Sequence, residues 1–165
     1  MSLAALLLSL LSSAEARTSV SLQVAPLLAG GVTVQAEHST ESLRWSFATS
    51  LGARASAAGD YRGSNVSLAF EVRRWWHVGP LSSAPLPGRV GGALLWARAE
   101  AVWVRLEHLD GSPVGASLRG GGSIGLGYRL LPGWRFELTP VLGVGFDFST
   151  HRLSAVPGLT VGVVF

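Results

Sequence analysis

The 165-residue sequence contains no cysteine and no lysine. Without cysteine the chain cannot form a disulfide framework, a zinc–cysteine cluster or a catalytic thiol. All 13 basic residues are arginine, a bias that a GC-rich genome would also produce. The planar guanidinium of arginine is suited to buried ion pairs, so the alternative interpretation is that these side chains pair inside the protein.

Long hydrophobic runs are also absent. The longest nearly unbroken apolar stretch covers residues 3–11, well short of the ~20 residues that a membrane-spanning helix requires. With 48% hydrophobic and 14% charged residues, the chain is not a disordered polyelectrolyte. If the protein sits in a membrane, it must cross it with strands. The net charge of +3 comes without a basic run, so we expect no nucleic-acid partner.

Residues 1–16 have the features of a cleaved signal peptide. Residues 3–11 match the hydrophobic segment of such a peptide, and Ala14-Glu15-Ala16 matches the small-x-small cleavage rule. We therefore expect residues 17–165 to form the mature protein, a single domain. Because no arginine or lysine precedes the hydrophobic segment, we also expect the true translation start to lie upstream of Met1.

Apolar and polar residues alternate with a period of two through most of the remaining chain. In residues 65–76 the even positions include Val66, Leu68 and Phe70, whereas the odd positions include Glu71. Successive side chains of a strand point to opposite faces, so each such segment predicts a strand with one apolar face. Eight strands are expected, at residues 19–28, 32–38, 42–55, 65–76, 90–107, 116–130, 134–148 and 155–165.

The two faces of these strands predict a barrel that is apolar outside. The apolar face carries large residues for ten or more positions, as a lipid-facing band does, whereas the polar face is rich in glycine, serine and charge pairs. A soluble barrel needs a more charged exterior. We therefore predict an all-β, eight-stranded antiparallel up-and-down transmembrane β-barrel. The division of residues 19–38 into one or two strands stays open, and Pro140 is expected to mark a bulge.

Aromatic residues support this arrangement. If strands alternate in direction from a periplasmic N-terminus, five outward rings fall at the periplasmic end of the barrel. An aromatic girdle at a membrane interface has this composition. The predicted girdle consists of Trp45, Trp76, Tyr128, Trp134 and Phe165.

The last residues of the chain resemble the C-terminal assembly signal of outer-membrane barrels, in which alternate apolar residues end in an aromatic one. The matching residues are Leu159, Val161, Val163 and Phe165. More broadly, residues 19–165 resemble the small OmpA/OmpX-like barrels and the uncharacterised outer-membrane barrel families. The resemblance implies a monomer in the outer membrane of a Gram-negative bacterium, exported through the periplasm. Its expected partners are outer-membrane lipids and the barrel-assembly machinery.

The polar face of the predicted strands carries charges of both signs. These residues are Glu37, Arg44, Arg54, Glu71, Arg73, Arg98, Glu100, Arg119, Arg129, Arg135, Glu137 and Asp147. An eight-stranded barrel is just wide enough for side chains to fill its interior, and a buried charge must be paired. We therefore predict a network of salt bridges that plugs the lumen of a structural envelope protein.

Two other functions remain as alternatives. The predicted lumen holds seven arginines against five carboxylates, so the surplus could line a narrow anion-preferring channel or transport-related barrel. A more remote alternative is a lipid-modifying enzyme, because Ser149, His151 and Asp147 could be drawn as a Ser–His–Asp set. No nucleophile elbow accompanies them. We therefore expect no catalytic residue, no cofactor and no metal site.

Overall fold

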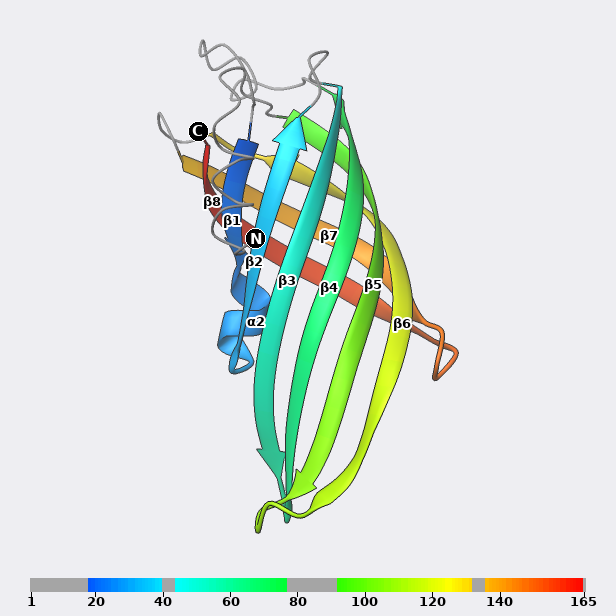
Figure 1. Ribbon diagram of the computed structural model, residues 1–165. Coiled ribbons are helices and arrows are strands. Elements are labelled where there is room, and N and C mark those ends of the chain that lie inside the picture. Colours follow the sequence, from blue (N-terminus) through cyan, green and yellow to red (C-terminus); the bar gives the residue numbers. More distant parts are fainter. Residues whose placement is uncertain (1–17, 40–43, 77–91, 132–135, 165) are drawn as a thin grey trace, which may run out of the picture.

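The computed structural model describes residues 18–39, 44–76, 92–131 and 136–164. These residues form eight strands and one short helix (Figure 1). The elements are β1 Thr18–Gln23, α2 Val24–Leu28, β2 Gly31–Ser39, β3 Trp45–Ala58, β4 Tyr61–Trp76, β5 Gly92–His108, β6 Pro113–Arg129, β7 Phe136–Asp147 and β8 Arg152–Val164. Each strand pairs antiparallel with its neighbour in the chain, and β8 closes on β1. The predicted eight-stranded antiparallel barrel is therefore confirmed.

The strands differ in length, and this difference shapes the molecule. Strands β3 to β6 have between 14 and 17 residues, whereas β1 has 6 and β2 has 9. Figure 1 shows β3–β6 as a long curved sheet that extends past the other four strands. The ladder between β6 and β7 covers only Gly121 to Gly127 of β6. One end of the barrel is therefore a complete ring, and the other is a half-open sheet.

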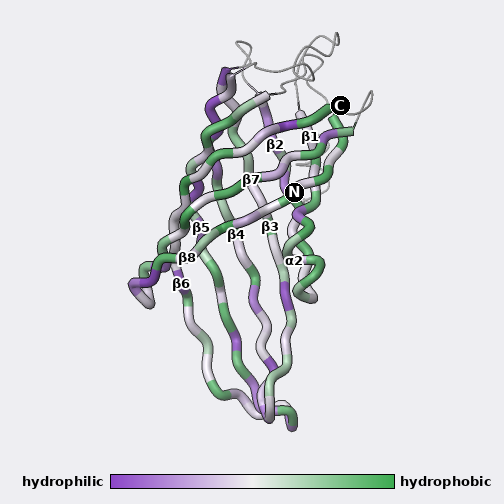
Figure 2. Tube along the Cα trace, turned by 180° about the vertical axis from the view of Figure 1, so that it is seen from behind, coloured by the Kyte–Doolittle hydropathy of each residue, from purple (hydrophilic) through white to green (hydrophobic). Residues whose placement is uncertain are grey.

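Buried and exposed residues alternate along the strands as the sequence predicts. In β2, Thr33, Gln35 and Glu37 are buried, whereas Val32 and Val34 between them are exposed. Figure 2 shows the same alternation of apolar and polar residues along the strands. The polar face therefore points into the lumen and the apolar face points outward. Within the described residues, no helix is long and apolar enough to span a membrane.

The first predicted strand is wrong in its second half. Residues 24–28 form the helix α2, so the chain makes a β1–β2 hairpin with a helical connection. Pro26 has no N–H and cannot continue a ladder, but it is tolerated in the first turn of a helix. The helix ends where Gly30 adopts a left-handed φ of 76°, a conformation that glycine adopts without steric cost.

Two other local predictions need correction. Residues 61–63, expected in a turn, belong to β4, and the β3–β4 turn is as short as Gly59-Asp60. Pro140 does not mark a bulge, because β7 keeps one continuous register with β8 through Thr139, Pro140 and Val141. The effect of Pro140 is on the other side: the β6–β7 ladder stops at Val141, and a single bridge joins Leu130 to Leu138 beyond it. A proline lacks the N–H that this ladder would use.

The middle of the lumen is filled by an apolar cluster formed by Trp75, Leu94 and Trp96, each at most 3% exposed. Glycines make the space for it. A Cβ added to Gly143 would lie 2.6 Å from Cζ2 of Trp96, and one added to Gly125 would lie 2.8 Å from the same atom. Real Cβ atoms do not approach this closely. The glycines of β6 and β7 thus let an indole fit inside a narrow barrel.

Candidate functional site in the barrel lumen

Beside the apolar cluster, charged side chains from four strands meet in one network. We call this network the ionic layer, and its members are Glu37, Glu71, Arg73, Arg129 and Glu137. One carboxylate oxygen of Glu37 binds both arginines. Nε of Arg73 donates to Oε1 of Glu71 at 2.5 Å, and Nη1 of Arg129 lies 3.3 Å from Oε2 of Glu137. All five residues are buried.

Neutral polar groups extend the ionic layer to further strands. The Ser19 hydroxyl of β1 donates to Oε1 of Glu137 at 3.2 Å, and Nε of Arg129 donates to the Thr139 hydroxyl at 3.2 Å. The guanidinium of Arg129 also lies 4.5 Å from the ring centroid of Trp75, a cation–π contact. The Trp75 indole N–H in turn donates to the Ser46 hydroxyl of β3 at 2.8 Å. The network therefore ties together β1, β2, β3, β4, β6 and β7.

On the side of the long sheet, the lumen opens into a cavity of about 630 Å³, which we call the outer cup. It lies between the inner face of β3–β6, the helix α2, and the ends of β7 and β8. Its charged lining residues are Arg54, Arg98, Glu100, Arg119 and Asp147. Three arginines and two carboxylates give the outer cup a formal charge of +1. The ionic layer, with two arginines and three carboxylates, has a formal charge of −1.

The other predicted lumen residues that the structure describes do not join the ionic layer. Arg98 pairs separately with Glu100, with Nη2 and Oε1 3.1 Å apart. Arg54 and Arg119 are exposed at the outer cup, and no described residue forms an ion pair with either. Arg44 is exposed just before β3. Arg135 lies outside the described residues.

Asp147, which was also predicted for the network, stabilises the β7–β8 turn instead. Its Oδ1 accepts hydrogen bonds from the Ser149 backbone N–H at 2.8 Å and from the Ser149 hydroxyl at 2.5 Å. It also accepts one from the Thr150 N–H at 3.2 Å. His151 packs edge-on against the ring of Phe146, with centroids 6.2 Å apart. The carboxylate thus binds the serine directly, and the three residues have the hydrogen bonds of a turn rather than those of a Ser–His–Asp relay.

Comparison with known proteins gives a match in fold. No family model and no curated protein matches the sequence. The N-terminal β-barrel domain of Pseudomonas aeruginosa OprF has 15% identity and a TM-score of 0.50, with 91% of this chain and 99% of that chain covered. Neisserial surface protein A has 13% identity and a TM-score of 0.49, with 91% and 94% covered. The chain shares its fold with a solved β-barrel. The likeness to the OprF domain agrees with the predicted architecture.

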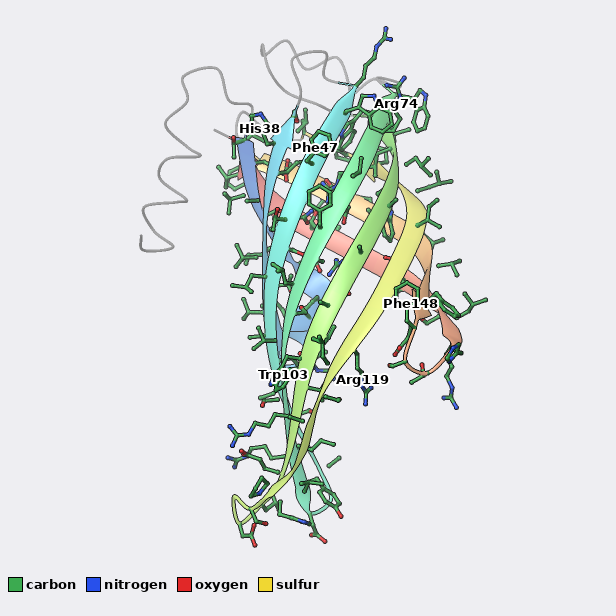
Figure 3. All side chains as sticks on the ribbon, turned by 45° about the vertical axis from the view of Figure 1, so that its right-hand side comes forward. His38, Phe47, Arg74, Trp103, Arg119 and Phe148 are labelled. Carbon is green, nitrogen blue, oxygen red and sulfur yellow. The ribbon has the colours of Figure 1, made fainter. Side chains whose placement is uncertain are left out.

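Three of the five aromatic residues predicted for a girdle are described, and they lie at the end of the barrel opposite the long hairpins. Trp45 begins β3 and Trp76 ends β4, and these residues are 43% and 45% exposed. Tyr128 stands next to the end of β6, in register with Ala93, which itself pairs with Trp76. The guanidinium of Arg74 lies 5.0 Å from the Trp45 ring centroid, and Figure 3 shows Arg74 at this end. Trp134 and Phe165 lie outside the described residues.

The predicted assembly signal lies on β8. Leu159, Val161 and Val163 occupy alternate positions of this strand, and Val161 is 41% exposed on the outer face. Phe165, the last member of the signal, lies outside the described residues. Among the described residues, no group of three or more His, Asp or Glu side chains is placed to hold a metal ion.

The sequence did not predict the part played by Trp75 and Trp96. Both are buried inside the barrel, and neither was assigned a role in the lumen from the sequence. The signal was present, because Trp75 has the same parity as Glu71 and Arg73, and Trp96 has the same parity as Arg98. A large aromatic residue on the polar face of a narrow barrel indicates a lumen that is filled rather than open.

Proposed function

We propose that this chain is an integral β-barrel of the bacterial outer membrane, with a structural role in the envelope and a lumen closed by the ionic layer. The observation that carries the proposal is the distribution of residues between the two faces of the barrel. Large apolar residues cover the outside, whereas salt bridges occupy the inside. A soluble barrel has the opposite distribution.

The exposed apolar residues on the outer face of individual strands support this proposal. On β4, Val66, Leu68 and Phe70 are each more than half exposed, and on β6 Leu126 is 64% exposed. Monomeric soluble proteins rarely expose so continuous an apolar surface. The closed ladder between β8 and β1 leaves the ring without an edge in this region, as a strand structure in lipid requires.

The filled lumen favours a structural role over the alternative of an anion channel. The ionic layer and the apolar cluster together occupy the ring where all eight strands are present. The ionic layer has a formal charge of −1, so it would repel an anion that entered from the outer cup. Its five buried charges are bound to one another and to polar groups of neighbouring strands, which suits a rigid plug.

One substitution separates a lipid-facing surface from a water-facing one. Ile124 lies near the middle of β6 on the outer face and is 56% exposed. In a bilayer, Ile124→Arg is expected to lower the free energy of unfolding by about 2–4 kcal/mol, the cost of arginine near the midplane. Unfolding by urea in lipid vesicles measures this change.

The matched control is Val114→Arg, on the same strand but in the protruding hairpin, where the side chain is 47% exposed. It is expected to change stability by less than about 0.5 kcal/mol. Equal effects of the two substitutions, or a wild-type protein that fractionates with soluble proteins and migrates identically on gels with and without boiling, would contradict the membrane assignment.

Conductance tests the closed lumen independently. The wild-type barrel inserted in a planar lipid bilayer is expected to give no steady ion current, because the filled ring of ion pairs and indoles leaves an ion no hydrated path. A steady anion-selective current would favour the channel alternative instead.

A further inference from the structure

The outer cup differs from the rest of the lumen because two of its arginines have no carboxylate partner among the described residues. Arg54 and Arg119 both line it, and neither forms an ion pair with any described residue. Figure 3 shows Arg119 on β6, near the point where the strand continues past the β7–β8 turn. Of the two carboxylates in the lining, Asp147 is held by the Ser149 and Thr150 donors of its turn. Two guanidinium groups without an ion pair to a described residue thus line the same space, and the lining as a whole keeps its formal charge of +1.

The strand register brings these two arginines to the same concave surface. Gly52 pairs with Ser67, Ser67 with Val102, and Val102 with Arg119, so one row of inward positions crosses the sheet from β3 to β6. Arg54 lies two residues beyond Gly52 on β3 and therefore points to the same face. Figure 1 shows that the sheet β3–β6 is curved, and both Arg54 and Arg119 line the outer cup on its inner face.

Arg98 adds a third guanidinium at the bottom of the outer cup. Its Nη2 is 3.1 Å from Oε1 of Glu100, but its Nε is buried with no hydrogen-bond partner in the described structure. A buried donor without a partner costs free energy, which a bound acceptor would recover. The base of the outer cup therefore offers an N–H group whose acceptor the described part of the chain does not provide.

The remaining lining is apolar or neutral. Ala25 and Pro26 of α2 face the cavity from one side, and Val156 and Phe146 face it from another. Beyond Gly121 the β6–β7 ladder has ended, so this wall of the outer cup is incomplete. A ligand could therefore carry a hydrocarbon part as well as a charged group, and it could enter from the end or from the side.

We propose that the outer cup is a binding site for a phosphate monoester, held by Arg54, Arg98 and Arg119. A phosphate monoester carries a charge of about −1.5 to −2 at neutral pH, opposite in sign to the outer cup, whose formal charge is +1 and which holds two arginines without an ion pair to a described residue. Guanidinium forks bind such oxygens through paired, charge-assisted hydrogen bonds. The ionic layer beneath has a formal charge of −1 and is filled, so the anion binds in the outer cup and does not pass through it.

The phosphate could belong to a soluble compound or to a lipid, and two probes distinguish these sources. Glycerol 3-phosphate and phosphatidic acid carry the same phosphate monoester, but only the second has acyl chains. Binding of glycerol 3-phosphate to the folded, detergent-solubilised full chain is measured by isothermal titration calorimetry. Retention of phosphatidic acid, in competition with phosphatidylcholine, is measured by native mass spectrometry of the same preparation.

The test variant is the double substitution R54Q/R119Q, which removes two exposed side chains that form no ion pair with a described residue. It is expected to weaken binding of the responsive probe by roughly a hundred-fold, about ten-fold for each guanidinium replaced. The control is Arg62→Gln, an equally exposed arginine on β4 that is absent from the lining of the outer cup. It is expected to bind as the wild type does.

Each result decides the proposal. Binding of glycerol 3-phosphate that the double variant abolishes supports a soluble ligand, and binding confined to phosphatidic acid supports a lipid. Wild-type protein that binds neither probe, or a double variant that binds as well as the wild type, overturns the proposal. The proposal goes beyond the structural role and does not depend on it. A difference in gel migration between boiled and unboiled protein shows separately whether the barrel itself is as proposed.

Discussion

The lumen has two halves, an inner one that holds the ionic layer and an outer one that holds the outer cup. Both contain inward-facing arginines and carboxylates, but they differ in burial and in ion pairing. In the inner half, both Arg73 and Arg129 form an ion pair with Glu37, and all three side chains are 3% exposed. In the outer half, Arg54 and Arg119 are exposed and have no ion-pair partner among the described residues. Both sets lie on the inward face of their strands. The inward position of a charge therefore does not decide whether it is paired.

The difference between the halves comes from strand length. Where all eight strands are present, inward side chains from opposite walls are forced into contact, and a charge that is left unpaired there is very costly. Where only β3–β6 continue, the opposite wall is missing (Figure 1). Solvent then reaches the arginines, and pairing is worth little. The same sequence pattern thus gives a buried network of ion pairs at one end and an open cup at the other.

The largest expected effect tests this comparison with one substitution in each half of β6. Arg129→Gln removes the arginine of Glu137 and one of the two arginines of Glu37, so buried carboxylates lose their compensation. The free energy of unfolding is expected to fall by about 3–5 kcal/mol. Urea unfolding in lipid vesicles, followed by tryptophan fluorescence, measures the change.

Arg119→Gln is the matched control on the same strand. Because Arg119 is exposed and has no ion pair with a described residue, its replacement is expected to change stability by less than about 0.5 kcal/mol. If the two variants proved equally stable, the ionic layer could not be the rigid plug that we propose.

A smaller effect on stability is expected from two glycine substitutions, one in the closed part of the barrel and one in the protruding hairpin. A Cβ at Gly143 would lie 2.5 Å from the Ile124 carbonyl oxygen and 2.6 Å from the Trp96 ring. Gly143→Ala is expected to cost about 1–3 kcal/mol through overpacking. At Gly115, on the protruding part of β6, a Cβ meets nothing within 4 Å. Gly115→Ala is expected to stay within about 0.5 kcal/mol of the wild type. Thermal unfolding of both variants measures the contrast, and a stable Gly143→Ala barrel would show that both Trp96 and the backbone at Ile124 can move aside.

Much of the fold could be predicted from the sequence because a strand has an exact side-chain period of two. The parity of Phe70 against Glu71 and Arg73 is enough to assign their faces, whatever the partner strand. The number of strands follows from counting such segments. The helix α2 could not be read in this way, because residues 24–28 continue the apolar parity of β1. The one argument against a strand there is Pro26, which has no N–H to donate to the hydrogen-bond ladder.

The site was less predictable, because its contacts join residues that are distant in the sequence. Glu37 and Arg129 are separated by 92 positions, and their meeting depends on the register of every strand between them. The outer cup depends on where the β6–β7 ladder stops, at Gly121 and Asp147. No pattern within a single strand contains this information. The inward charges could therefore be named from the sequence, but not their division into paired and unpaired members.

The smallest expected effect lies at the tip of the outer region, in the β5–β6 turn. Oδ1 of Asp110 accepts hydrogen bonds from the Ser112 backbone N–H at 2.8 Å and from its hydroxyl at 2.7 Å. These donors, the backbone N–H first, hold the pKa of Asp110 below its ordinary value of 3.8. Ser112→Ala removes the hydroxyl and keeps the N–H, so the pKa of Asp110 is expected to rise part of the way to its ordinary value.

The sign of the linked effect on stability follows from the lowered pKa. A carboxylate whose pKa is depressed by folding adds stability above its unfolded pKa, and this contribution is lost as the pH falls through the folded pKa. For a fully exposed group the contribution is small, so NMR titration of the Asp110 carboxyl is a better measurement than unfolding. Ser117→Ala, on β6 beyond the turn, is the control and should leave the titration unchanged. An Asp110 that titrates identically in wild type and Ser112→Ala would mean that the hydroxyl contributes nothing to its pKa. The Ser112 backbone N–H, the first cause of the lowered pKa, would then act without help from the hydroxyl.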